Sequence, residues 1–250
     1  MKLSPFRALR ALTPARLGLG RAGSGVPTAE LLGFGLAHAR ARDAVHRALD
    51  VETVAAGLRA LGLSPAVVHS AAPDRETYLR RPDLGRRLAD GEVIPKCGHD
   101  IGLVVADGLS ALAVERHAVP LISALIALAP QRWAGVGCAV ALQGRVALGD
   151  GIGAAMGAKL VVVLIGERPG LSSPDSLGAY LTWAPRVGRV DAERNCVSNI
   201  RPQGLGYEAA ARRVDWLAAA GLARGLTGVG LRDESGLENQ GRTTISDPRG

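Results

Sequence analysis

A glycine-rich segment at residues 149–154 is the first feature of this sequence whose residue types could do chemistry. It reads Gly-Asp-Gly-Ile-Gly-Ala and matches the GxGxxA pattern with which dinucleotide-binding domains turn from a strand into a helix around a pyrophosphate. Glu167 follows the next apolar run, roughly where such domains carry a ribose-binding acid. These residues suit a nicotinamide-dependent oxidoreductase. The same glycines suit a tight turn with close helix-to-strand packing, so both interpretations stay open.

A second cluster, formed by Cys97, His99 and Asp100, holds residue types that bind metal ions or assist phosphate hydrolysis. A metal site needs three or four converging ligands, and the remaining histidines show no spacing that would supply them. We therefore interpret the cluster as a loop that precedes a strand. The sequence has no Walker loop, no Gly-x-Ser-x-Gly elbow and no nucleophile flanked by a base. It lacks a recognisable complete catalytic set.

Three segments contain more charged and polar side chains than loops that only connect strands and helices need. They are residues 144–146, 166–170 and 194–201. We predict that all three are loops at one edge of a sheet, because ligands bind beside the carboxyl ends of parallel strands.

Apolar periodicity and capping signals predict the elements that position these loops. We expect helices over 28–46, 110–129 and 207–225, and strands over 101–106, 138–142, 159–165 and 179–183. Pro120 should interrupt the second helix, and Val214, Trp216 and Leu217 should face inward from the third. The third strand is almost entirely β-branched or Leu, which is typical of a strand buried on both faces of a parallel sheet. The sequence therefore predicts the α/β class.

The net charge of +7 is unevenly distributed, because every charged residue before Glu30 is a Lys or an Arg. We interpret this basic arm as a docking segment, and a solvated terminus or a presequence are the alternatives. Few aromatic residues and the mixing of basic with acidic residues elsewhere argue against nucleic-acid binding. We divide the chain into the arm at 1–24, a helical segment at 25–95, a sheet domain at 96–232 and a disordered tail at 233–250.

Cysteine usage and hydropathy indicate a soluble intracellular protein with no membrane partner. The three cysteines lie far apart with no CxxC pair, which fits neither a disulfide framework nor a structural zinc site. The apolar run at 121–129 is too short to span a bilayer.

Several segments together resemble the family of ethanolamine ammonia-lyase small subunits, and the resemblance covers nearly the whole chain. Most specific are residues 166–177, Gly-Glu-Arg-Pro-Gly-Leu-Ser-Ser-Pro-Asp-Ser-Leu, and residues 193–200, Glu-Arg-Asn-Cys-Val-Ser-Asn-Ile. Further matching segments are 20–23, 38–45, 78–87 and 106–110. The chain departs from many members in being shorter before the first strand and in its C-terminal tail.

The resemblance implies a Rossmann-like α/β domain with a mostly parallel sheet flanked by helices and a helical N-terminal segment. It implies that this domain and the barrel of a large subunit enclose adenosylcobalamin, in a complex of six large and six small subunits. The large subunit then holds the substrate, and the complex is a carbon–nitrogen lyase that converts ethanolamine into acetaldehyde and ammonia by a radical mechanism. The implied location is the cytoplasm, inside a shell-bounded microcompartment in bacteria that build one.

The family's cobalamin contacts carry over to Val146, Glu167 and Cys196, each in its matching motif. A corrin ring is a broad apolar disc rimmed with amides, so it suits apolar contact from Val146 and acceptor oxygens from Glu167. Residue type alone would favour a small buried hydrophobe at Cys196. In the same segments Arg145, Arg168 and Arg194 are candidates for the phosphate of the cofactor's nucleotide loop or for the partner subunit. The sequence lacks Asp-x-His-x-x-Gly, the motif by which some cobalamin proteins supply a histidine to the cobalt. This agrees with the resembled family, in which the cofactor keeps its own dimethylbenzimidazole base as the lower ligand.

Overall fold

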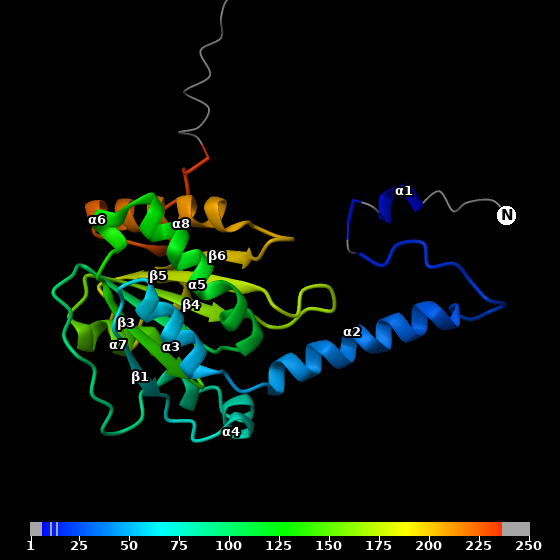
Figure 1. Ribbon diagram of the computed structural model, residues 1–250, viewed down its shortest axis with the longest axis horizontal. Coiled ribbons are helices and arrows are strands. Elements are labelled where there is room, and N and C mark those ends of the chain that lie inside the picture. Colours follow the sequence, from blue (N-terminus) through cyan, green and yellow to red (C-terminus); the bar gives the residue numbers. More distant parts are fainter. Residues whose placement is uncertain (1–6, 11, 14, 237–250) are drawn as a thin grey trace, which may run out of the picture.

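A six-stranded sheet forms the centre of the protein (Figure 1). The computed structural model describes residues 7–10, 12–13 and 15–236. Its strands are β1 (Pro65–His69), β2 (Ile101–Ala106), β3 (Gly137–Leu142), β4 (Leu160–Gly166), β5 (Leu177–Trp183) and β6 (Arg194–Ile200). The strand order is β1-β3-β2-β4-β5-β6.

The sheet is mixed. The strands β1, β3, β2 and β4 pair in parallel, whereas β5 is antiparallel to both β4 and β6. The expected α/β class, with a sheet flanked by helices, is confirmed. Two antiparallel pairings and a strand order unlike that of dinucleotide-binding domains distinguish this sheet from a Rossmann sheet.

Helices cover the two sheet faces unequally. The longer helices are α2 (Thr28–His46), α3 (Val51–Ala60), α5 (Ala111–Leu128), α7 (Leu148–Met156) and α8 (Tyr207–Arg224), and the short ones are α1 (Arg7–Arg10), α4 (Arg75–Arg80) and α6 (Pro130–Trp133). One face packs against α3, α5 and α8 in the larger core cluster. The opposite face packs against α7 in a smaller cluster. The three 3₁₀ helices are η1 (Leu84–Arg86), η2 (Asp191–Glu193) and η3 (Gly228–Gly230).

The helix α5 begins where the sequence predicts, because the Ser110 hydroxyl accepts a hydrogen bond from Ala113 N at 3.2 Å as an N-cap. The expected interruption at Pro120 was wrong, since α5 continues through it. Burial of Ala118, Leu121 and Ile122 on the sheet outweighs the backbone hydrogen bond that a proline removes. By length and composition α5 could also cross a membrane, but its apolar residues pack in the larger core cluster.

The glycine-rich segment at 149–154 is not a turn but lies inside α7. A Cβ at Gly149 would come within 2.2 Å of Val163 Cγ2, and one at Gly153 within 2.8 Å of Val161 Cβ. These glycines therefore let α7 pack closely on β4, so the second interpretation is confirmed for the close helix-to-strand packing and was wrong for the tight turn. The dinucleotide-binding interpretation was wrong, because its glycines must form the loop that precedes the helix.

The N-terminal part of the chain contributes more than helices. The strand β1 comes from 25–95, where we expected only helices, and pairs with β3 at the sheet edge.

Trp216, expected to face inward, is only half-buried, while its neighbours Val214 and Leu217 are in the core. Of the expected disordered tail, residues 237–250 lie outside the described part of the chain, as do residues 1–6, 11 and 14 of the arm.

Candidate functional site

The strands β5 and β6 have one covered face and one open face. Ala179, Leu181 and Val197 point into the larger core cluster, where α8 covers them. The neighbouring positions on the other face include Tyr180 and Cys196, which pair across the two strands and therefore point the same way. Tyr180 is half-buried and Cys196 is exposed. We call this surface, together with Glu167 and Gly178, the open face.

Glu167 follows β4 directly, and its side chain lies across the start of β5. Its Oε2 accepts hydrogen bonds from Asn199 N at 3.2 Å and from the Ser176 hydroxyl. A Cβ at Gly178 would come within 3.0 Å of Glu167 Oε1, so the missing side chain leaves room for the carboxylate. Among the described residues Glu167 Oε1 has no hydrogen-bond donor, so this oxygen can accept a bond from a ligand.

Cys196 lies within β6 and not in a loop, so the expectation of a loop at 194–201 was wrong for most of that segment. Enclosure by neighbouring atoms raises the pKa of its thiol, and the nearby Tyr180 hydroxyl offsets part of this effect. Burial likewise raises the pKa of Tyr180. Both groups are therefore neutral near pH 7, which suits neutral contact with a ligand and not nucleophilic attack.

Val146 lies in the connection between β3 and α7, which a buried carboxylate holds in place. Asp107 Oδ2 and Oδ1 accept hydrogen bonds from Gln143 N and Gly144 N, each at 3.0 Å. The Tyr78 hydroxyl donates to Gly144 O at 3.1 Å. Gln143 adopts a positive φ of 55°, which brings the two backbone N–H groups onto one carboxylate. We call residues 143–147 the clamped loop.

A second charged group supports the same clamp. Arg75 Nη1 lies 3.4 Å from Asp107 Oδ2 and donates to Gly108 O at 2.8 Å. The guanidinium carbons of Arg75 and Arg145 lie 4.8 and 4.3 Å from the centre of the Tyr78 ring. Asp107 is 2% exposed and Tyr78 is fully buried, so the clamp is part of the interior. Sequence reasoning missed both residues, although an Asp directly after a buried strand was a usable signal for Asp107.

The structure brings the three candidate contacts to one side of the sheet. Val146 and Tyr180 both pack against the smaller core cluster, on the α7 face. Val146 also lines a cavity of about 340 Å³ together with Arg194, two residues before Cys196 in β6. Val146 and Glu167 are half-buried, and Cys196 is exposed.

The three candidate arginines have different surroundings. Arg194 is buried and its Nη1 and Nη2 lie 2.6 and 2.7 Å from Asp150 Oδ1 and Oδ2. This internal ion pair removes Arg194 from the candidates for binding a phosphate. Arg168 is exposed, and Arg145 lines the 340 Å³ cavity beside Val146 with no carboxylate partner among the described residues.

The cluster near Cys97 is a loop before β2, as the sequence predicts. Asp100 Oδ1 pairs with Lys159 Nζ at 3.0 Å on the surface. In the part of the chain that the structure describes, no group of histidine, cysteine and carboxylate residues is arranged to hold a metal ion.

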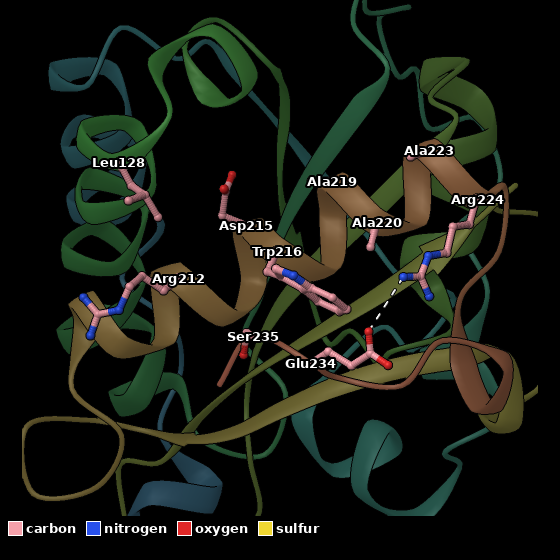
Figure 2. A pocket seen from close by; sticks show the side chains of 10 residues that line it. All are labelled: Leu128, Arg212, Asp215, Trp216, Ala219, Ala220, Ala223, Arg224, Glu234 and Ser235. Atoms are coloured by element: carbon pink, nitrogen blue, oxygen red, sulfur yellow. Dashed lines mark ion pairs between the residues drawn. The ribbon is translucent and has the colours of Figure 1, made fainter. Parts of the chain in front are cut away.

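A cavity of about 880 Å³ lies along the outer side of α8 and not at the open face (Figure 2). Trp216 forms part of its wall, which explains why that ring is half-buried. Residues 234–235 close one side, where Glu234 Oε2 lies 3.8 Å from Arg224 Nη2. None of the three candidate contacts lines this cavity.

The described residues form an α/β domain in which one part of a sheet face, the open face on β5 and β6, is not buried, and they contain no assembled catalytic set. The comparisons with known proteins identify the family of this domain. Residues 3–232 match the family model described as ethanolamine ammonia-lyase light chain. The chain belongs to this family.

Curated relatives that have the name ethanolamine ammonia-lyase small subunit align with this chain over most of their length. The ethanolamine ammonia-lyase small subunit of Bradyrhizobium diazoefficiens is 55% identical over 92% of this chain and 91% of its own. That of Ralstonia nicotianae is 53% identical over 92% and 88%. That of Azotobacter vinelandii is 51% identical over 93% and 89%.

Proposed function

We propose that this chain is the small subunit of an adenosylcobalamin-dependent ethanolamine ammonia-lyase and supplies one wall of the cobalamin site. The large subunit supplies the other wall and holds ethanolamine. The observation that carries the proposal is that three positions matched to the family's cofactor contacts lie on one side of the sheet, Glu167 and Cys196 on the open face and Val146 in the clamped loop, and none is sealed in the core.

The residues present fit a corrin. Val146 offers an apolar contact beside the clamped loop, and Cys196 offers a neutral, polarisable one. Glu167 Oε1 has no donor within the described chain, and the amides at the rim of a corrin ring are donors that need acceptors. Val146 lies on the same side of the sheet as the open face, so a ligand as broad as a corrin is the kind that would contact all three side chains.

When bound, adenosylcobalamin supplies the radical chemistry that converts ethanolamine into acetaldehyde and ammonia. The residues of this chain bind and orient the ring. Glu167 fixes its rotation by accepting an amide hydrogen, while Val146 and Cys196 exclude water from its surface. In this proposal the three residues bind the ring and take no part in proton transfer.

The assembly and location follow the family. The small and large subunits form a hetero-oligomer of six copies each in the cytoplasm, within a microcompartment where the cell builds one. No nucleic acid and no membrane take part in this function.

The test is a Glu167→Ala variant reconstituted with the large subunit. A hydrogen bond to a charged group contributes about 1.5–3 kcal/mol, so the affinity for adenosylcobalamin should fall by a factor of roughly 10 to 150. Visible absorbance measures the affinity and ammonia release measures activity. Glu208→Ala on α8, which packs on the other face of the sheet, is the matched control and should change neither. Equal affinity of the Glu167 and Glu208 variants would show that the open face does not bind the corrin.

A further inference from the structure

The first half of α2 is apolar and exposed on all sides. Leu31, Leu32, Phe34 and Leu36 are 60%, 68%, 44% and 53% exposed. Successive residues of a helix rotate by about 100°, so these four side chains do not form a single stripe. A helix that is apolar all round is normally enclosed by other parts of a protein. Only Ala44, near the other end, is buried, and Figure 1 shows α2 projecting away from the sheet domain.

The chain itself gives this half of α2 little support. Anchoring contacts are at the C-terminal end, where Arg47 Nη2 lies 2.7 Å from Glu115 Oε2. Gly33 and Gly35 lie inside the helix, and a Cβ at either would meet nothing within 4 Å. Each glycine costs about 1 kcal/mol of helix stability relative to Ala, and unsupported helices are marginal in water. The segment therefore needs a partner that packs around it and that approaches its backbone closely.

The charge of the surrounding segment indicates the chemistry of that partner. Residues 7–42 contain six arginines and one acid, Glu30, which leaves a net charge of +5. Glu30 is already near a cation, since its Oε1 lies 3.5 Å from Arg10 Nη1. The Arg16 guanidinium lies 5.7 Å from the centre of the Phe34 ring, so positive charge borders the apolar surface. A matching surface is an apolar groove with carboxylates at its rim.

We propose that residues 7–42 form a docking arm that seats in such a groove on the ethanolamine ammonia-lyase large subunit. The inference rests on the proposed function in taking the large subunit as the partner. A second copy of this chain fits less well, because two arms of +5 would repel each other. A membrane surface also fits less well, because interfacial helices separate an apolar face from a charged one, and this half of α2 does not.

The test uses the full chain with Leu32→Glu and Phe34→Glu together. Glu is a good helix former and both positions are exposed, so the unfolding temperature should stay as in the wild type. Binding to the large subunit is measured by bio-layer interferometry in the absence of corrinoid. Its affinity should weaken by more than about 100-fold, because apolar anchors dominate interface energies. Val93→Glu with Val229→Glu is the control, since these valines are 82% and 90% exposed outside the arm, and it should bind as the wild type does.

A second variant tests the charge. Arg40→Glu with Arg42→Glu should slow association and reduce its dependence on salt, because positive charge steers the encounter. The proposal is wrong if the Leu32 and Phe34 variant binds the large subunit like its control. It is also wrong if that variant loses only self-association of the small subunit, or only binding to vesicles of anionic lipid. The Glu167→Ala variant should bind the large subunit as the wild type does. A failure of the corrin proposal can therefore be told apart from a failure of the docking proposal, because it would appear as an unchanged corrinoid affinity of the Glu167→Ala complex.

Discussion

Asp107→Asn is the perturbation that tests most directly whether the clamped loop positions Val146. Asp107 is 2% exposed and its two carboxylate oxygens each accept one backbone N–H of the loop, at 3.0 Å. Asn has the same shape but only one acceptor oxygen. Its amide nitrogen must face one of the two N–H groups, so one buried donor loses its partner.

The magnitude follows from these contacts. A buried donor without a partner costs about 1–3 kcal/mol. Arg75 also loses its counter-charge but keeps its hydrogen bond to Gly108 O at 2.8 Å, so the total is roughly 2–4 kcal/mol. Domains are stable by about 5–15 kcal/mol, so the variant should still fold. At about 2–4 °C per kcal/mol for a chain of this size, the unfolding temperature should fall by roughly 5–15 °C.

The assay pairs thermal unfolding with corrinoid affinity in the reconstituted complex. We expect the lower unfolding temperature together with about tenfold weaker affinity, because the loop that carries Val146 loses its fixed position. Asp100→Asn is the matched control: its ion pair with Lys159 is 57% and 60% exposed and should contribute at most about 1 kcal/mol. An unchanged unfolding temperature for Asp107→Asn would refute the clamp. Lower stability with unchanged affinity would place the clamped loop outside the cofactor site.

Two further predictions concern packing and pH. Gly149→Ala should destabilise the chain by about 1–3 kcal/mol in denaturant unfolding, because the new Cβ would come within 2.2 Å of Val163 Cγ2. Gly151→Ala, where the nearest atom is 3.6 Å away, should instead stabilise it by roughly 0.5–1 kcal/mol; equal effects would contradict the account of α7. Burial lowers the pKa of His117 from 6.5 despite the raising effect of Asp175, with Arg116 and Arg201 also lowering it. As the pH falls, His117 is therefore protonated in the unfolded chain before it is protonated in the folded protein. The free energy of unfolding should then decrease as the pH drops below 6.5. His117→Gln should flatten that decline in unfolding temperature between pH 7 and pH 5, and an unchanged slope would assign it to other groups.

The elements that sequence reasoning located are those with an unambiguous pattern. The strands β2 and β4 are buried along their whole length, so their apolar runs are continuous. The helix α5 has a Ser cap and a long apolar repeat. Its continuation through Pro120 was unpredictable, because the packing of its neighbours on the sheet decides it, and that packing is not local.

The elements that were missed or misassigned are edge strands with weak patterns. The strand β6 is buried at Arg194, Val197 and Ile200, a spacing of three that alternation does not reveal, and its pairing with β5 shifts register near Leu177. It reads as a polar loop because its open face carries polar residues. The strand β1 has only five residues and begins with a proline, which favours an edge position. In both cases the partner strand, and not the segment itself, determines the structure.

The candidate contacts illustrate the same division between local signal and distant cause. The family motifs locate Val146, Glu167 and Cys196, but nothing near these residues says that they share a sheet face. That follows from topology: β5 reverses direction beside β4, so the end of β4 and the end of β6 meet at Glu167. The helix α8 covers only the other face of β5 and β6, and on this face Tyr180 is half-buried and Cys196 is exposed. Water can hydrate the exposed groups of this face, so a covering ligand is supported by its fit: the proposed corrin suits the acceptor oxygen of Glu167 that is free among the described residues and the neutral thiol of Cys196.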